Sequence, residues 1–168
     1  MKLILFRHGL AVEREVFMMQ KKDDALRPLV EKGRERTRKM AKILKQQVPA
    51  VDLLVTSPYV RAQQTASILQ ETIKAKSIAE SVDLVPSAPP MAFAQWMKMH
   101  AKNALTIVAV GHEPQLSVLA TWLLSGQVDS FIDLKKSGAI CLDLENFETA
   151  GPRTAELKWI VSSKNFEA

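Results

Sequence analysis

The sequence predicts an α/β protein with a mostly parallel central sheet. Short apolar runs alternate along the chain with segments whose apolar residues recur every three or four positions, which is typical of strands alternating with helices. Such alternation favours a parallel sheet, because consecutive parallel strands are usually joined by a helix. The length of 168 residues fits one domain, so we expect a single domain over residues 1–168.

The N-terminal part of the chain contains a predicted strand, a loop and a helix. Residues 2–6 are an apolar run that ends at Arg7, as a buried strand would. Residues 10–28 have no steady period and predict a long loop. Residues 31–47 predict a helix because their apolar side chains share one face. Gly33 lies on that face, which indicates the close approach of another backbone. The other residues of the face are Thr37, Met40, Ala41, Leu44 and Val48.

The remaining elements alternate in the same way. Residues 51–56 predict a strand. Ser57 and Pro58 predict a helix start, because serine is a frequent N-cap and proline is favoured at the first helical position. The further predicted elements are a short strand at 82–85, a helix over 91–102, a strand over 105–110, a helix over 115–124 and strands over 139–144 and 156–161. We expect the last two strands to form an antiparallel edge.

The composition bears on location and partners. Cys141 is the only cysteine, so no internal disulfide can form and a reducing, cytoplasmic location is favoured. No apolar run approaches the roughly 20 residues of a membrane helix, and the N-terminal run is too short for a signal peptide. The formal charge is +5, with basic residues concentrated in residues 31–45. This segment is either a solvated helix face or a docking surface for an anionic partner.

Polar residues follow three of the predicted strands at the point where each strand ends. Arg7 and His8 end the first strand, Ser57 ends the second with Arg61 one helical turn further on, and His112 ends the strand over residues 105–110. Ligands of open parallel sheets bind outside the carboxyl ends of the strands. We therefore expect Arg7, His8, Arg61 and His112 to converge on one ligand.

This set of residue types indicates an anion. Arginine offers forked donors that match phosphate oxygens, and no metal-ligating carboxylate accompanies the two histidines. Gly9 has no side chain, so an oxyanion could approach its backbone. Taken singly, His8 could be a structural histidine, Arg61 a surface cation and His112 a helix cap, but their shared position favours a binding site. His100 lacks this context and is expected at the surface.

Three segments resemble the histidine phosphatase (phosphoglycerate mutase-like) superfamily. They are Leu5-Phe6-Arg7-His8-Gly9, Thr56-Ser57-Pro58-Tyr59-Val60-Arg61-Ala62-Gln63-Gln64-Thr65-Ala66 and Val110-Gly111-His112-Glu113-Pro114. The short chain, Arg27-Pro28-Leu29 and Ser137-Gly138-Ala139-Ile140 resemble the SixA-type phosphohistidine phosphatases within it. The resemblance implies a single three-layer α/β/α domain.

The resemblance also implies a role for each matched residue. His8 would attack phosphorus and carry the phosphoryl group as a covalent intermediate that water hydrolyses. Arg7, Arg61 and His112, with the backbone at Gly9, would bind the substrate phosphoryl oxygens. The resemblance implies no metal and no cofactor.

The sequence offers one candidate for the general acid. Larger superfamily members carry a catalytic glutamate in an inserted segment. Residues 77–90 contain no convincing equivalent of that glutamate, although Glu80 and Asp83 are near. Glu113 is the candidate, because another branch places an acidic residue directly after the matching histidine. Its ordinary structural explanation is an acidic residue at a helix start, which the helix dipole favours.

The weak signal for an acid favours a phosphohistidine substrate on a protein domain. Imidazole leaves a P–N bond far more readily than an alkoxide leaves a phosphate ester, so it depends less on protonation. A phosphatase for a small phosphorylated metabolite is the alternative, with residues 10–26 as a lid. A phosphate-binding module without activity would not need His8. A nucleic-acid binder is disfavoured because the basic segment lacks interleaved aromatic residues, and no membrane association is expected.

Overall fold

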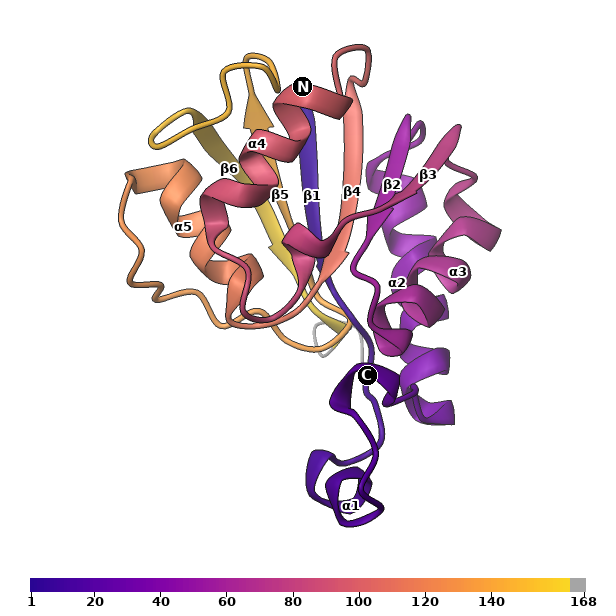
Figure 1. Cartoon of the computed structure of the whole chain (residues 1–168). Coiled ribbons are helices and arrows are strands. Elements are labelled where there is room, and N and C mark those ends of the chain that lie inside the picture. Colours follow the sequence, from indigo (N-terminus) through magenta and orange to yellow (C-terminus); the bar gives the residue numbers. More distant parts are fainter. Residues whose placement is uncertain (164–168) are drawn as a thin grey trace.

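A computed structural model describes residues 1–163 and confirms the mostly parallel α/β sheet. Six strands form one sheet in the order β3-β2-β4-β1-β5-β6 (Figure 1). The strands are β1 (Lys2–Arg7), β2 (Leu53–Thr56), β3 (Ser77–Glu80), β4 (Thr106–Gly111), β5 (Ala139–Leu144) and β6 (Ala155–Val161). The four strands from β3 to β1 are parallel, whereas β5 is antiparallel to both β1 and β6. The predicted antiparallel edge is therefore confirmed.

Helices cover both faces of the sheet and make the expected three layers. They are α2 (Glu31–Gln47) and α3 (Val60–Ile73) on one face and α4 (Pro90–His100) and α5 (Gln115–Ser125) on the other (Figure 1). Alternate residues of β1 supply the two cores, because side chains of a strand point to opposite faces. Ile4 and Phe6 pack with α2 and α3, and Leu3 and Leu5 pack with α4 and α5.

Residues 10–28, predicted as a loop, contain two short helical pieces. They are α1 (Arg14–Met19) and a 3-10 turn at Asp24–Leu26. A helix of six residues completes fewer than two turns, which is too short to show a period in the sequence. The segment projects from the body of the protein beyond the sheet (Figure 1), and we call residues 10–28 the arm. An isolated bridge between Ala11 and Leu29 closes its base.

The strand predicted at residues 82–85 is wrong. The edge strand β3 lies at Ser77–Glu80, and Val82–Leu84 form a 3-10 turn in which Ser81 accepts a hydrogen bond from the Asp83 amide at 3.2 Å. Most of β3 is exposed, so it lacks the apolar run that marks a buried strand. Because β3 ends at Glu80 and α4 begins at Pro90, only residues 81–89 connect the two elements.

The helix that follows β2 begins at Val60 and not at Pro58. Ser57 Oγ accepts a weak hydrogen bond from the Tyr59 amide at 3.3 Å, but its closer partner is His112 Nε2, at 2.8 Å. The predicted cap is thus wrong, because a tertiary partner takes the hydroxyl. The short turn over residues 57–59 brings Ser57 and Tyr59 against His112.

The expectations for Cys141, His100 and Gly33 are confirmed. Cys141 is buried and His100 is exposed. A Cβ atom built on Gly33 would lie 2.1 Å from the carbonyl oxygen of Leu10, so α2 and the start of the arm touch through their backbones.

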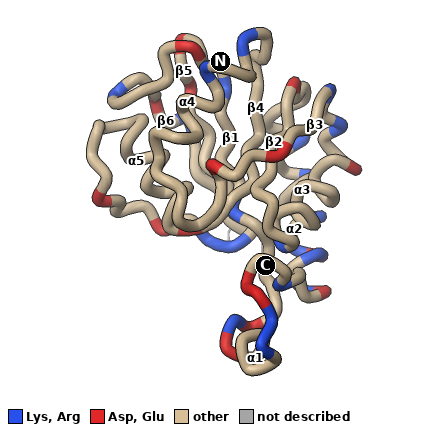
Figure 2. Tube along the Cα trace, viewed as in Figure 1, with Lys and Arg blue, Asp and Glu red and all other residues tan. Residues whose placement is uncertain are grey.

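Over residues 1–163, the structure contains no helix long and apolar enough to span a membrane. Basic and acidic residues are spread over most of the chain, the arm included (Figure 2).

Candidate active site

The structure brings together the four residues that end the parallel strands. His8 follows β1, His112 follows β4, and Arg61 lies in the first turn of α3, after β2. The His8 and His112 rings lie 4.9 Å apart, centroid to centroid, and both histidines are buried. All four residues line one cleft of about 460 Å³. A larger groove, about 620 Å³, lies between α3 and β3 and contains none of them.

The ring of His8 is held in one tautomer. Its Nδ1 lies 2.7 Å from the carbonyl oxygen of Gly9, which can only accept, so Nδ1 carries the proton. Its Nε2 accepts a hydrogen bond from Arg61 Nε at 3.3 Å. Burial lowers the pKa of His8 to about 3. The hydrogen bond with the Gly9 carbonyl acts against this shift, and the positive charges of Arg61, Arg7 and Arg27 add to it. At neutral pH the imidazole is therefore uncharged, with a lone pair on Nε2.

Two buried nitrogens in this site have no partner among residues 1–163. They are Nε of Arg7 and Nδ1 of His112. Two other polar atoms of these residues are already engaged: Arg7 Nη1 donates to the Leu134 carbonyl at 2.7 Å, and His112 Nε2 is bonded to Ser57 Oγ at 2.8 Å. Buried polar nitrogens are normally hydrogen-bonded, so these two atoms fit a ligand that supplies acceptors, as a phosphoryl group does.

Gly9 has a packing role that sequence analysis did not identify. Its amide donates to Thr65 Oγ1 at 3.0 Å, so it is already engaged inside the protein. A Cβ on Gly9 would lie 2.7 Å from Thr37 Oγ1 and 3.0 Å from the Gly33 carbonyl. The absence of a side chain therefore lets the turn after His8 pack against α2.

Glu113 lines the same cleft as His8. Burial raises the pKa of Glu113 above its usual value, although hydrogen bonds from the Ser117 hydroxyl (2.6 Å) and amide (3.1 Å) act in the opposite direction. A carboxyl group with a raised pKa is more readily protonated near neutral pH. Glu113 thus has one property that a proton donor requires.

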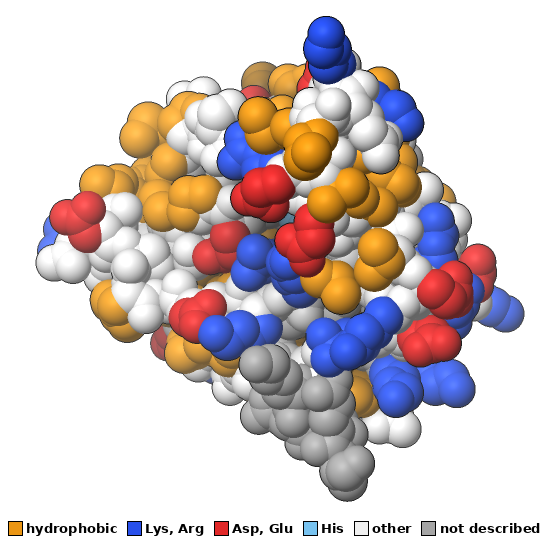
Figure 3. Space-filling model, turned by 90° about the horizontal axis from the view of Figure 1, so that it is seen from below, with side chains coloured by type: hydrophobic (Ala, Val, Ile, Leu, Met, Phe, Trp, Pro, Cys, Tyr) orange, Lys and Arg blue, Asp and Glu red, His pale blue; other side chains and the backbone are white. Residues whose placement is uncertain are grey.

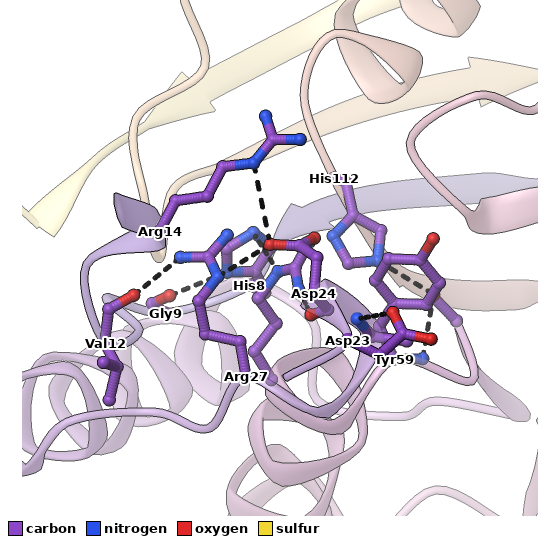
Figure 4. A network of polar contacts seen from close by, with 12 residues as sticks. His8, Gly9, Val12, Arg14, Asp23, Asp24, Arg27, Tyr59 and His112 are labelled. Carbon is purple, nitrogen blue, oxygen red and sulfur yellow. Dashed lines mark hydrogen bonds and ion pairs between the residues drawn. The ribbon is translucent and has the colours of Figure 1, made fainter. Parts of the chain in front are cut away.

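The arm supplies five residues of the cleft wall that were not predicted as site residues: Glu13, Arg14, Glu15, Asp24 and Arg27. Asp24 and Arg27 line the cleft, and Figure 4 shows them gathered with His8 and His112. The Asp24 carboxylate accepts from Arg61 Nη2 at 3.0 Å and from Arg27 Nε at 2.9 Å. The available signal was the run of charged residues that ends at Asp24, three residues before Arg27.

Tyr59 is a further cleft residue that sequence analysis did not single out. Its ring meets the His112 ring edge to face at 5.0 Å and lies 4.9 Å from the guanidinium carbon of Arg61. The ring therefore packs against two of the four convergent side chains. It forms part of the cleft wall.

The electrostatics of the cleft suit an anion. Arg7, Arg27 and Arg61 surround His8, and Asp24 offsets part of their charge. Among the described residues, no three side chains of His, Cys, Asp or Glu are grouped as metal ligands. Seen from the side of the cleft, the surface carries acidic and basic side chains close together (Figure 3).

Comparisons with known proteins agree with the fold and give the family. The profile of the histidine phosphatase superfamily (branch 1) matches residues 3–85. An uncharacterized protein of Picosynechococcus is 35% identical over 143 residues, which are 84% of each chain. The phosphohistidine phosphatase SixA of Escherichia coli is 24% identical over 148 residues, 85% of this chain and 86% of that protein.

Solved structures of phosphatases share this fold over nearly the whole chain. The protein histidine phosphatase SixA with tungstate superposes with a TM-score of 0.84 at 21% identity, covering 99% of this chain and 100% of that one. The α-ribazole phosphatase of Shigella flexneri superposes with a TM-score of 0.71 at 18% identity, over 97% of each chain. The chain belongs to the histidine phosphatase superfamily, within which it is of the SixA type. It is a phosphatase with the phosphoglycerate mutase-like fold.

Proposed function

We propose that the protein transfers a phosphoryl group from its substrate to His8 and then to water. The observation that carries the proposal is the neutral, buried His8 ring, whose Nε2 lone pair faces the guanidinium of Arg61. In the first step the Nε2–P bond forms while the bond from phosphorus to the leaving group breaks, and the leaving group takes up a proton. In the second step water attacks phosphorus, the P–Nε2 bond breaks and phosphate is released.

The charge that develops on the phosphoryl oxygens is balanced by side chains of the cleft. Arg7 and Arg61 provide guanidinium donors, and His112 provides a ring nitrogen. The two guanidinium groups supply the positive charge that a metal ion would otherwise provide, and the neutral His112 ring adds a hydrogen-bonding nitrogen. We therefore propose a hydrolase that uses neither a metal nor a cofactor. We further propose that residues 1–168 form one domain. The expected location is the cytoplasm, a reducing environment in which Cys141 stays a thiol.

We assign the leaving-group proton to Glu113. Burial raises the pKa of its carboxyl group, and it lines the cleft beside His112. Asp24 does not suit this role. Burial alone would raise the pKa of Asp24, but Arg61 and Arg27 outweigh that effect and hold it below the usual value. Asp24 therefore stays ionised and has no proton to give at neutral pH.

The substrate class that fits best is a phosphohistidine on a protein domain. Only residues 81–89 connect β3 to α4, so this connection contains no inserted domain that would enclose a small substrate. The SixA relatives carry the name of phosphohistidine phosphatase. A small phosphorylated metabolite is the second candidate, favoured by the shared fold of the α-ribazole phosphatase.

The test is phosphate release from phosphohistidine proteins and from phosphorylated metabolites, with His8→Ala and the exposed His100→Ala as matched variants. We expect His8→Ala to abolish turnover and His100→Ala to retain it. Rapid quenching of the wild type should trap an acid-labile phosphate on His8. Turnover that survives in His8→Ala within about tenfold removes His8 from the chemistry.

A further inference from the structure

Asp24 holds the guanidinium of Arg61 at both terminal nitrogens. Nη1 donates to the main-chain carbonyl of Asp24 at 2.7 Å, and Nη2 donates to its carboxylate at 3.0 Å. The third nitrogen, Nε, donates to His8 Nε2 at 3.3 Å. Asp24 therefore fixes both terminal nitrogens of the planar Arg61 guanidinium, and the third nitrogen, Nε, points at His8.

Asp24 is itself held in place from the other side. Its second carboxylate oxygen accepts from Arg27 Nε at 2.9 Å and lies 3.9 Å from Arg14 Nε. The turn that carries it is closed by Asp23, whose side chain accepts a hydrogen bond from the Ala25 amide at 2.9 Å. Asp24 is thus a fixed carboxylate, and Arg61, only 3% exposed, cannot easily turn away from it.

The contact has two physical consequences. Because a guanidinium is planar, fixing both terminal nitrogens fixes the direction of the N–H at Nε. That direction points to the atom on which the phosphoryl group would be carried. In addition, a carboxylate beside Arg61 repels a phosphate anion bound to the same guanidinium, which weakens the hold on the product.

We propose that Asp24 is a positioning residue that aims Arg61 at the phosphoryl group on His8 and lowers the affinity of the cleft for free phosphate. The inference rests on the proposed role of His8. The alternative is a purely structural role, in which Asp24 only attaches the arm to the rest of the domain. A structural role predicts that loss of the carboxylate weakens phosphate binding and slows turnover together. A positioning role predicts that turnover slows while phosphate binds more tightly.

The experiment compares Asp24→Asn with Asp23→Asn, a neighbouring carboxylate that does not contact Arg61. The substrate is p-nitrophenyl phosphate, whose good leaving group needs no general acid, and inorganic phosphate is the inhibitor. For Asp24→Asn we expect kcat to fall about 10- to 100-fold, less than the 10²–10³ of a deleted donor, while the inhibition constant of phosphate decreases at least threefold. Asp23→Asn should stay within twofold of wild type in both values.

Asp24→Glu provides the second variant in case Asp24→Asn does not fold. It keeps the charge but displaces the carboxylate, so kcat should fall while the inhibition constant of phosphate stays within twofold of wild type. A kcat within threefold of wild type in the folded variants, or weaker phosphate binding in Asp24→Asn, overturns the inference. If wild type forms phospho-His8 and Asp24→Asn behaves normally, only this inference fails. If wild type forms no phospho-His8, the proposed function fails and this inference with it.

Discussion

Arg61 Nε donates to His8 Nε2 at 3.3 Å, and both side chains are buried. The contact joins a permanent cation to the lone pair of an imidazole that carries its proton on the opposite nitrogen. It therefore disfavours a second proton on His8 and keeps the ring neutral.

Acid should destabilise the protein through its two buried histidines. Burial is the main cause that lowers the pKa of His8 to about 3 and of His112 to about 2, whereas an unfolded histidine titrates near 6.5. Below pH 6.5 the unfolded chain binds more protons than the folded protein, so the free energy of unfolding falls as the pH falls. Between pH 6.5 and the folded pKa values, each histidine contributes a slope of up to about 1.4 kcal/mol per pH unit.

Urea denaturation at pH 7 and pH 5 measures this effect. The wild type should lose about 2 kcal/mol for each buried histidine. His112→Asn should have a shallower pH dependence than the wild type, although it is less stable at pH 7. The exposed His100→Asn should retain the wild-type difference between the two pH values. Equal stability of the wild type at pH 7 and pH 5 contradicts the neutral, buried state of the pair.

Loss of either guanidinium group of Arg7 or Arg61 should slow turnover strongly. Arg7→Ala and Arg61→Ala should each lower kcat by about 10²–10³, as the loss of one oxyanion donor typically does. Both should also weaken the binding of vanadate, measured by inhibition. Arg38→Ala is the control, because Arg38 is exposed on α2 and pairs with Glu31 at 3.2 Å, away from the cleft. The assignment fails if Arg7→Ala and Arg61→Ala bind vanadate as tightly as wild type.

Replacement of Glu113 should separate the two substrate classes. The imidazole that leaves a phosphohistidine has a conjugate-acid pKa of about 6.5, so it needs little help from an acid. An alkoxide is far more basic and depends on protonation. Glu113→Gln should keep kcat/KM for phosphohistidine within about tenfold and lower it for an alkyl phosphate about 10²-fold or more. Equal damage to both substrates, with wild type as fast on the alkyl phosphate, favours the metabolite phosphatase.

Gly33→Ala should destabilise the fold although alanine is the better helix former. The gain in helix propensity is about 1 kcal/mol, but the new Cβ would lie 2.1 Å from the Leu10 carbonyl oxygen. Backbone cannot yield as a flexible side chain does, so a net loss of about 1–3 kcal/mol is expected from overpacking. Gly151→Ala is the matched control, because its nearest neighbour would be 3.6 Å away. Thermal unfolding of both variants checks the prediction, and an unchanged Tm in Gly33→Ala contradicts it.

The sequence predicted those parts of the fold in which pattern and packing agree. The helix over residues 31–47 has the expected bounds because its buried face repeats over more than four turns. The convergence of Arg7, His8, Arg61 and His112 followed from the rule for strand ends. The loop predicted over residues 10–28 contains α1, which is too short to show a period, and β3 lies outside the predicted range because an exposed edge strand needs no apolar run. The contact between Asp24 and Arg61 joins residues 37 positions apart, which no local pattern reveals.

The position of β4 in the sheet decides when the site can form. β4 lies between β1 and β2 and pairs with both, so the strands that lead to His8 and Arg61 do not touch each other. A chain that has left the ribosome only as far as residue 100 already contains His8, Asp24 and Arg61, yet the strand that must separate and align them is still missing. Nascent chains of this length should hold no assembled cleft. The capacity to take up a phosphoryl group therefore arises late in synthesis, once residues 106–112 are free to join the sheet.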